Sequence, residues 1–243
     1  MRLLVTGGAG YLGSEVCRRA VEAGHDVVAT QFHAPAPFGR ALTVDLRRPV
    51  DLPDADVVIH TAYVQADPDM IVRSTRNVAN AARDAKLIYV STDLVFDGGH
   101  APYGEDDEPR PVSEYGQAKL EAERLVTGGL VVRTSLLVGK PGPQEALAAR
   151  DDVVFHEDEI RCPTQVADLA AALLELAALD VTGVLHVAGP DAVSRLELAR
   201  LLGARDPTGV PTPHGRARNV SLDSSRATRL LRTRLRGILQ IQG

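Results

Sequence analysis

The chain has 243 residues, 44% of them hydrophobic and 24% charged, with a net charge of −5; these values exclude disordered, collagen-like and disulfide-scaffold proteins. Aromatic residues make up 4%, tryptophan is absent and only two cysteines occur, which argues against a nucleic-acid stacking platform and a cysteine-based zinc site. No run reaches the ~18 apolar residues that cross a bilayer, and Gly7-Gly8 comes too early for a secretory leader. We therefore expect a cytoplasmic globular protein without nucleic-acid or membrane partners.

Short apolar runs alternate with helical patterns along most of the chain. The runs at 2–6, 26–30, 56–60, 87–91, 130–133 and 183–187 predict strands. Helical spacing begins at Leu12, with Gly24 placed to cap that helix, and further helices are predicted at 68–85, 114–126 and 166–179. Strands that are apolar throughout are buried on both faces, and the crossovers between such parallel strands are right-handed. The pattern predicts an α/β fold with a doubly wound parallel sheet.

A glycine-rich turn joins the first expected strand to the first expected helix. The segment Thr6–Gly13 satisfies G-x-G-x-x-G at Gly8, Gly10 and Gly13, and it also has the wider spacing that begins at Gly7. Glycines let the backbone approach a pyrophosphate, whose charge is met by the N–H groups that open the helix. The turn therefore predicts a dinucleotide site, with an ordinary glycine-rich turn as the alternative.

The end of the second expected strand bears on the choice of dinucleotide. An NAD site usually has an acidic residue there, whereas this strand ends in Thr30-Gln31-Phe32-His33, and Arg40 follows. Without a carboxylate to repel it, a 2′-phosphate can be attracted by His33 or Arg40. We expect NADP(H) rather than NAD(H); the alternative is that these residues line a loop that never touches the cofactor.

Tyr115 and Lys119 lie four residues apart and share one face of an expected helix. A free tyrosine titrates near pH ~10. A neighbouring ammonium group stabilises the tyrosinate and tunes the phenol as a general acid or base. Ser91-Thr92-Asp93 ends a strand that runs toward the same crevice and offers hydroxyls to a substrate carbonyl. The alternative is a surface tyrosine packed over a lysine stem.

In this order the motifs resemble the extended short-chain dehydrogenase/reductase superfamily. Within it, the segments 90–98, 102–105 and 109–116 are similar to those of dTDP-4-dehydrorhamnose reductases. Further matches at 163–164, 168–170, 186–189 and 221–223 extend the resemblance over nearly the whole chain.

The resemblance implies a Rossmann domain that holds NAD(P)H and a smaller C-terminal part that holds a nucleotide-sugar. It implies that Thr92, Tyr115 and Lys119 are catalytic: Tyr115 protonates the alkoxide formed from a ketone, Thr92 holds its oxygen, and Lys119 tunes Tyr115 and binds the nicotinamide ribose. Besides Tyr115 and Lys119, the residues that match the family's cofactor-contacting segments are Gly7, Gly10, Tyr11, Leu12, Gly13, Asp45, Leu46, Thr61, Ala62 and Tyr63.

The expected division of the chain follows from these assignments. Residues 1–138 form the dinucleotide-binding Rossmann domain, with 165–190 also packing on it, and residues 139–164 and 191–243 form a reduced substrate-binding part. From residue 205 onward the chain contains eight arginines and only two acidic residues. This positive balance indicates either a solvated basic helix or a surface for a small phosphorylated ligand.

Two departures from the family pattern fall on the substrate side. Leu94 replaces the usual aromatic residue after the Ser-Thr-Asp triplet, and the family typically runs tens of residues longer between Gly139 and Cys162 and near the C-terminus. The histidines lack paired ligand spacing, so we expect no metal site, and we interpret Cys162 as a packing or lining residue.

The predicted activity is NAD(P)H-dependent reduction of a keto group on a nucleotide-activated deoxysugar. A nucleotide-sugar epimerase or dehydratase, and a non-catalytic NADP-binding regulatory subunit, are the alternatives. A homodimer is compatible with all three.

Overall fold

The computed structural model describes residues 1–82, 84–139 and 141–240, so the predicted helix 68–85 and the predicted substrate-binding part each include positions outside the described residues. The chain forms two compact units. Unit 1 comprises Met1–Ser91, Gln117–Val132 and Ala170–Val184, and unit 2 comprises Thr92–Gly116, Arg133–Leu169 and the chain from Leu185 onward. Both units are defined by packing alone. The boundary between a cofactor-binding part that ends at 138 and a substrate-binding part that begins at 139 stays a prediction.

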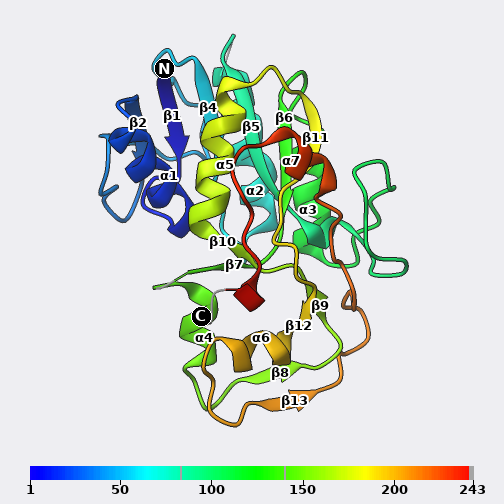
Figure 1. Ribbon diagram of the computed structural model, residues 1–243. Coiled ribbons are helices and arrows are strands. Elements are labelled where there is room, and N and C mark those ends of the chain that lie inside the picture. Colours follow the sequence, from blue (N-terminus) through cyan, green and yellow to red (C-terminus); the bar gives the residue numbers. More distant parts are fainter. Residues whose placement is uncertain (83, 140, 241–243) are drawn as a thin grey trace. The chain divides into compact units, whose positions relative to one another are not determined.

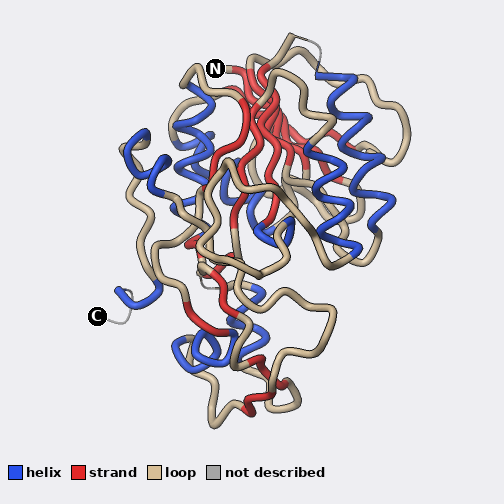
Figure 2. The backbone as a smooth tube through the Cα atoms, turned by 90° about the vertical axis from the view of Figure 1, so that its right-hand side faces the viewer, coloured by secondary structure: helices blue, strands red, loops and turns tan. Residues whose placement is uncertain are grey.

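A seven-stranded parallel sheet, in the order β11-β6-β5-β4-β1-β2-β3, organises unit 1 (Figure 1). Helices lie on both sides of the sheet (Figure 2), which confirms the doubly wound Rossmann-like fold predicted from the alternation of strands and helices. The strands are β1 (Arg2–Thr6), β2 (Asp26–Gln31), β3 (Arg40–Thr43), β4 (Val57–His60), β5 (Lys86–Thr92), β6 (Leu130–Thr134) and β11 (Gly183–His186), and the helices associated with them are α1 (Tyr11–Glu22), α2 (Pro68–Ala82), α3 (Glu114–Glu123) and α5 (Val166–Ala178).

Burial explains why the central strands read as unbroken apolar runs. Every residue of β4 is buried, and so are all residues of β1 except the first. Both faces of these strands are covered, so neither face selects polar side chains. Gly24, with φ +77°, ends α1 as expected.

Two local features differ from the sequence-based expectation. Helix α3 ends at Glu123 rather than Val126, because the backbone N–H groups of Leu125 and Val126 bond to carbonyls three residues back, so tight turns replace the α-helical pattern. Strand β3 was not expected because its residues are mostly exposed and form no apolar run. Its first residue, Arg40, pairs with Val28, about 10 Å before the carboxyl end of β2.

Unit 2 is built from short elements. They are η1 (Asp93–Val95), β7 (Leu137–Val138), α4 (Pro143–Ala148), β8 (Val154–His156), β9 (Ile160–Arg161), β10 (Thr164–Gln165), β12 (Val193–Ser194), α6 (Arg195–Leu201), β13 (Thr208–Val210), α7 (Ser225–Leu230) and η2 (Ile238–Gln240). Three two-stranded pairs, β10–β7, β12–β9 and β13–β8, connect segments that are distant in sequence. None of the described helices of the chain is both long and apolar enough to span a membrane.

Helix α6 supplies apolar side chains to two small clusters in unit 2. Leu198 packs with Val138, Val193 and Ile238, whereas Leu196 packs with Phe155. Ser194 caps the start of the helix, because its hydroxyl accepts a hydrogen bond from the backbone N–H of Glu197, three residues later. Unit 2 therefore has its own apolar packing.

A buried histidine connects three elements of unit 1. His60 lies at the end of β4; its Nδ1 is 2.6 Å from the Thr6 hydroxyl on β1, and its Nε2 is 3.1 Å from the Thr75 hydroxyl on α2. The Thr75 hydroxyl donates to the carbonyl of Ile71, so Nε2 carries the proton and Nδ1 accepts from Thr6. Burial lowers the pKa of His60 to about 3, with the Lys119 charge adding to the effect, and the ring is neutral at physiological pH.

His60 makes the stability of the protein depend on pH. The unfolded chain binds a proton at this histidine below pH ~6.5 but the folded chain only near pH 3. The free energy of unfolding should therefore fall as pH decreases below 6.5, with His60 contributing up to ~1.4 kcal/mol per pH unit. Chemical denaturation between pH 5 and 7 measures how steeply the free energy of unfolding depends on pH. His60→Asn should remove the part of this dependence that comes from one proton, up to ~1.4 kcal/mol per pH unit. The control His33→Asn, at an exposed position, should not. An unchanged slope in His60→Asn would contradict the assignment.

Candidate functional site

The turn between β1 and α1 is shaped by glycine contacts with backbone. Gly7 has φ +71°, and the backbone N–H of Gly10 donates to its carbonyl at 2.8 Å. A Cβ on Gly13 would lie 2.1 Å from the same carbonyl oxygen, so the first turn of α1 packs directly on the loop. A Cβ on Gly10 would meet only that oxygen, at 3.1 Å. The turn thus leaves room for a ligand to approach its backbone at Gly10.

The N-terminus of α1 suits an anion. Gly10 is the N-cap residue and provides no side chain, and the first turn of the helix holds no acidic residue. The positive end of the helix dipole is therefore not compensated by a local carboxylate. The chain continues from β1 to β2 in one direction and from β4 to β5 in the other, so the turn lies at the switch point of the sheet, where ligands of such folds bind.

The other residues predicted to contact the cofactor follow the carboxyl ends of neighbouring strands of unit 1. Thr61, Ala62 and the exposed Tyr63 follow β4, and Asp45 and Leu46 follow β3. The Thr6 hydroxyl accepts the backbone N–H groups of Thr61 and Ala62 at 3.2 and 3.3 Å, which ties the β4 segment to the glycine turn. The structure therefore brings these sequence-predicted segments to one edge of the sheet.

The carboxylate of Asp45 is held by arginine. Arg47 Nε donates to it at 2.8 Å, and this hydrogen bond is the main reason that the pKa of Asp45 is lowered. The Arg47 guanidinium also lies over the ring of Phe32, 5.1 Å from its centre. Arg47, which our sequence analysis did not single out, thus places a cation beside the residue after β2, whereas Arg40 opens the neighbouring strand.

Lys119 is a buried cation in unit 1. Its side chain comes from α3, its residue is 3% exposed, and its Nζ donates to the carbonyl of Val90 on β5 at 2.7 Å. Nζ also lies over the rings of Tyr89 and Tyr63, 4.3 and 5.1 Å from their centres. Burial lowers the pKa of Lys119 to about 7, with the Glu123 carboxylate opposing the effect only in part. This ammonium group therefore titrates near physiological pH.

Thr92 and Tyr115 belong to unit 2. Thr92 is the N-cap of η1, where its hydroxyl accepts the backbone N–H of Leu94 at 3.2 Å. Tyr115 is half-buried in the first turn of α3, and the next residue, Gly116, packs so closely that a Cβ would lie 2.1 Å from the Leu94 carbonyl oxygen. This contact presses the start of α3 against η1, the short helix that Thr92 opens.

Sequence analysis missed the ion pair beside Thr92. Asp93 is completely buried in unit 2 and accepts two hydrogen bonds from Arg161, which comes from β9. The pair joins positions 68 residues apart. The only local signals were the Ser-Thr-Asp triplet and an arginine next to Cys162, and neither indicates that the two meet. Cys162 itself is buried, and burial raises the pKa of its thiol to about 11, in keeping with a packing role.

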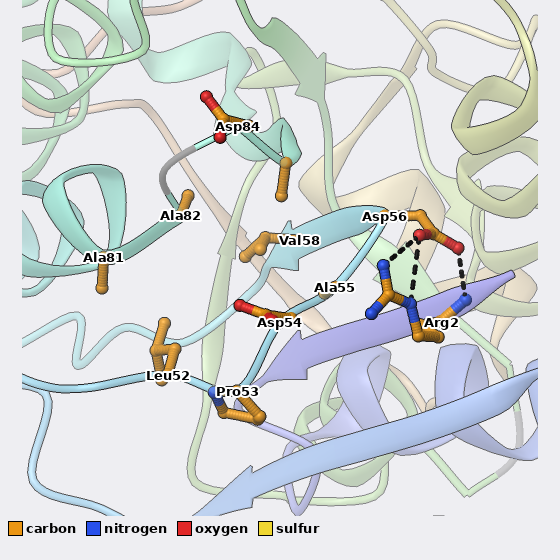
Figure 3. A pocket seen from close by; sticks show the side chains of 11 residues that line it. Arg2, Leu52, Pro53, Asp54, Ala55, Asp56, Val58, Ala81, Ala82 and Asp84 are labelled. Carbon is orange, nitrogen blue, oxygen red and sulfur yellow. Dashed lines mark hydrogen bonds and ion pairs between the residues drawn. The ribbon is translucent and has the colours of Figure 1, made fainter.

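A pocket of about 430 Å³ lies elsewhere in unit 1 (Figure 3). Arg2, at the start of β1, lines it and forms an ion pair with Asp56 at 2.8 Å, just before β4. The pocket is therefore at the amino ends of these strands, opposite the glycine turn. Ligands in parallel sheets bind at the carboxyl ends, so we do not assign this pocket to the candidate site.

A family model, described as the RmlD substrate binding domain, matches residues 1–236 of the chain. Among curated relatives, the dTDP-4-dehydrorhamnose reductase of Mycobacterium tuberculosis is 35% identical over 230 residues, covering 82% of this chain and 73% of the relative. The methionine adenosyltransferase 2 subunit beta of Rattus norvegicus is 30% identical over 248 residues, covering 88% of this chain and 74% of the relative.

Solved structures are similar over almost the full length. A hypothetical dTDP-4-dehydrorhamnose reductase from Sulfolobus tokodaii superposes with a TM-score of 0.83 at 28% identity, covering 96% of both chains. Two structures below 25% identity share the fold: a dTDP-4-dehydrorhamnose reductase from Bacillus anthracis in complex with NADP (TM-score 0.78, 23% identity, 98% and 96% covered) and MoeE5 in complex with UDP-glucose and NAD (TM-score 0.86, 24% identity, 98% and 96% covered).

Burial of the Lys119 ammonium should cost stability. The pKa of Lys119 is about 7 in the folded chain and ~10.4 in the unfolded chain. The free energy of unfolding should therefore rise with pH across this window, and the full energetic cost of burying the charge applies below pH 7. Lys119→Met removes the cation and keeps the stem, so we expect the free energy of unfolding at pH 6 to rise by ~1–2 kcal/mol. Thermal and chemical denaturation test this.

Lys86→Met is the matched control. Lys86 is less buried than Lys119, and its Nζ donates to two carbonyls, those of Leu176 and Leu179 near the end of α5. The hydrogen bonds lost in this variant therefore outweigh the smaller cost of burying the charge, and the change should destabilise the protein. A lower stability in Lys119→Met as well would contradict the proposed cost of burying its charge.

Proposed function

Since the chain belongs to the family of the RmlD substrate binding domain, we propose that it is an NAD(P)H-dependent reductase of a keto group on a nucleotide-activated deoxysugar. The observation that carries this proposal is the arrangement around α3. Its first turn carries Tyr115, and the next residue, Gly116, packs on the short helix that Thr92 caps. Its second turn carries Lys119. These are the residue types that proton transfer to an alkoxide requires.

The glycine turn fits a dinucleotide. At Gly10 a single Cβ would occupy the space above the Gly7 carbonyl, and the uncapped start of α1 offers N–H groups to a pyrophosphate. When bound, NAD(P)H supplies the hydride for reduction. Gly7–Gly13, Asp45, Leu46 and Thr61–Tyr63 would hold it, together with Lys119 at the ribose.

Tyr115 is the proposed acid. Reduction of a ketone leaves an alkoxide, and the phenol donates its proton to that oxygen while Thr92 supports the oxygen with its hydroxyl. A cationic Lys119 would favour the phenolate that remains. Because the pKa of Lys119 is near 7, its charge in the free protein depends on pH in the physiological range; a bound phosphate group would favour the charged form.

NADP(H) is the cofactor that we favour. The strand end 31–33 carries no acid, and the Arg47 guanidinium lies beside Phe32, where it can attract a 2′-phosphate in addition to its bond with Asp45. His33 is exposed at the same strand end. Arg40 is less suitable than our sequence analysis expected, because it stands at the amino end of β3.

A regulatory role is the second candidate. The similarity to the methionine adenosyltransferase 2 subunit beta, a protein named as a subunit, favours it. Such a protein would bind the cofactor without turnover. An epimerase or dehydratase would recycle its cofactor, so net formation of oxidised cofactor separates reduction from both alternatives.

Replacement of Tyr115 tests the proposed reaction. With NADPH and a nucleotide-linked 4-keto-6-deoxysugar, the wild-type protein should form stoichiometric NADP+ and the reduced sugar. Tyr115→Phe lacks the acidic proton, so kcat should fall by about 10²–10⁴-fold. Absorbance of NADPH follows the rate, and NADPH affinity, which this change should leave nearly intact, shows that the site is still formed. Full activity of Tyr115→Phe would eliminate the proposed acid.

Two glycine variants test the cofactor site. Gly10→Ala should leave the thermal midpoint nearly unchanged but weaken NADPH binding more than about tenfold, because its methyl group meets only one protein atom and fills the space that the pyrophosphate needs. Gly13→Ala should lower the thermal midpoint, because its methyl group collides with the Gly7 carbonyl. Titration calorimetry with NADPH and NADH measures binding and compares the two cofactors. Unaltered NADPH affinity in Gly10→Ala would contradict the assignment of the turn.

A further inference from the structure

Unit 2 contains a buried ion pair next to the proposed catalytic threonine. Arg161 is 5% exposed and Asp93 is fully buried. Arg161 Nε donates to Asp93 Oδ2 at 2.7 Å, and Nη2 donates to Oδ1, so the contact is bidentate. The Ser135 hydroxyl also donates to Oδ2. A bidentate pair of this kind holds both partners in one orientation.

The pair reaches Thr92 through Asp93. Thr92 Oγ1 donates to Asp93 Oδ1 at 3.2 Å and accepts the backbone N–H of Leu94 at 3.2 Å. A hydroxyl has one proton, so Thr92 must give up its bond to Asp93 before it can donate to a substrate oxygen. Arg161 and Ser135 continue to satisfy the carboxylate when this happens, which makes the exchange inexpensive.

Arg161 also interacts with Tyr115 through charge. Burial by itself would lower the pKa of Arg161, but the charge and hydrogen bonds of Asp93 outweigh it and the pKa is raised, with further contributions from Glu159 and from the Tyr115 phenolate. This electrostatic interaction is mutual, so a cationic Arg161 stabilises ionised Tyr115, whereas the Asp93 carboxylate opposes ionisation. Lys119, on the same helix as Tyr115, is the further cation.

We propose that Arg161 and Asp93 are a positioning pair for proton transfer: together they hold the Thr92 hydroxyl ready to turn toward substrate, and they place two opposite charges in and beside η1, on which the turn of α3 that carries Tyr115 packs. This inference rests on the proposed function for the role of Thr92. Its electrostatic part concerns Tyr115 in the free protein and can be measured without turnover.

The test measures ionisation of Tyr115 from the ultraviolet absorbance of tyrosinate, taken as the difference between each protein and the same protein with Tyr115→Phe. Arg161→Met removes a cation and should raise the apparent pKa of Tyr115 by about one unit, whereas Asp93→Asn removes an anion and should lower it by a similar amount. The double variant Arg161→Met/Asp93→Asn should return it toward the wild-type value.

The double variant also guards against misfolding, because removal of both charges avoids leaving one of them buried and unpaired. Arg216→Met is the matched control: its guanidinium is half-exposed and pairs with Glu159 at 2.9 Å but has no bond to Asp93, so Tyr115 should titrate as in the wild type. Arg161→Lys keeps the charge but loses the bidentate geometry. It should lower kcat about tenfold without moving the titration.

The proposal predicts that the pH dependence of turnover shifts in the same directions as the Tyr115 titration. Reduction needs protonated Tyr115, so the pH at which kcat declines on the alkaline side should follow the titration, upward in Arg161→Met and downward in Asp93→Asn. A purely structural ion pair would lower the thermal midpoint in these variants and leave the Tyr115 titration where it is, and that result would overturn the proposal. If the wild-type protein reduces no keto-sugar while the titration shifts as stated, the proposed function fails and the electrostatic coupling stands.

Discussion

The hydrogen bond from Lys119 Nζ to the carbonyl of Val90 holds a buried ammonium group against strand β5, and the proposed chemistry depends on this contact. A buried ammonium group needs compensation, and among the described residues the Val90 carbonyl, the faces of two tyrosine rings and the charge of Glu123 supply it only in part. This limited compensation explains why its pKa is near 7. A cation that is so poorly solvated is available to interact with a ligand, and the protein keeps it at a cost in stability.

Three successive residues at the end of strand β5 make three different contacts. The carbonyl of Val90 accepts the ammonium of Lys119, the hydroxyl of Ser91 donates to Glu123 at 2.5 Å, and the hydroxyl of Thr92 caps η1. Successive side chains of a strand point in opposite directions. The side chains of Ser91 and Thr92 can therefore serve different contacts without competing, and a one-residue shift in register would turn each of them to the opposite face.

The two candidate functions share the nucleotide site and differ on the substrate side. Residues 7–13 need only glycine contacts and a helix N-terminus to bind an anion, and a regulatory subunit can retain them as readily as an enzyme. Catalysis additionally requires an acid with a tuned acidity and a hydroxyl that can exchange partners. The arrangement of Arg161, Asp93 and Thr92 provides for such an exchange, and this chemistry favours the enzyme over the binding protein.

The order of strands and helices, the glycine turn and the spacing of Tyr115 and Lys119 were predictable from the sequence because each depends on residues that are close in the chain. Apolar runs identify strands covered on both faces, and a four-residue spacing on a helix identifies a shared face. Tertiary structure alone decided the rest. The exposed edge strand β3 has no apolar signal and forms because β2 offers it a free edge. The hydrogen bond between His60 and Thr6 and the bond between Asp93 and Arg161 join side chains separated by 54 and 68 residues. No local pattern encodes which distant partners meet, because a buried charge or imidazole is stabilised by whatever the folded chain brings to it.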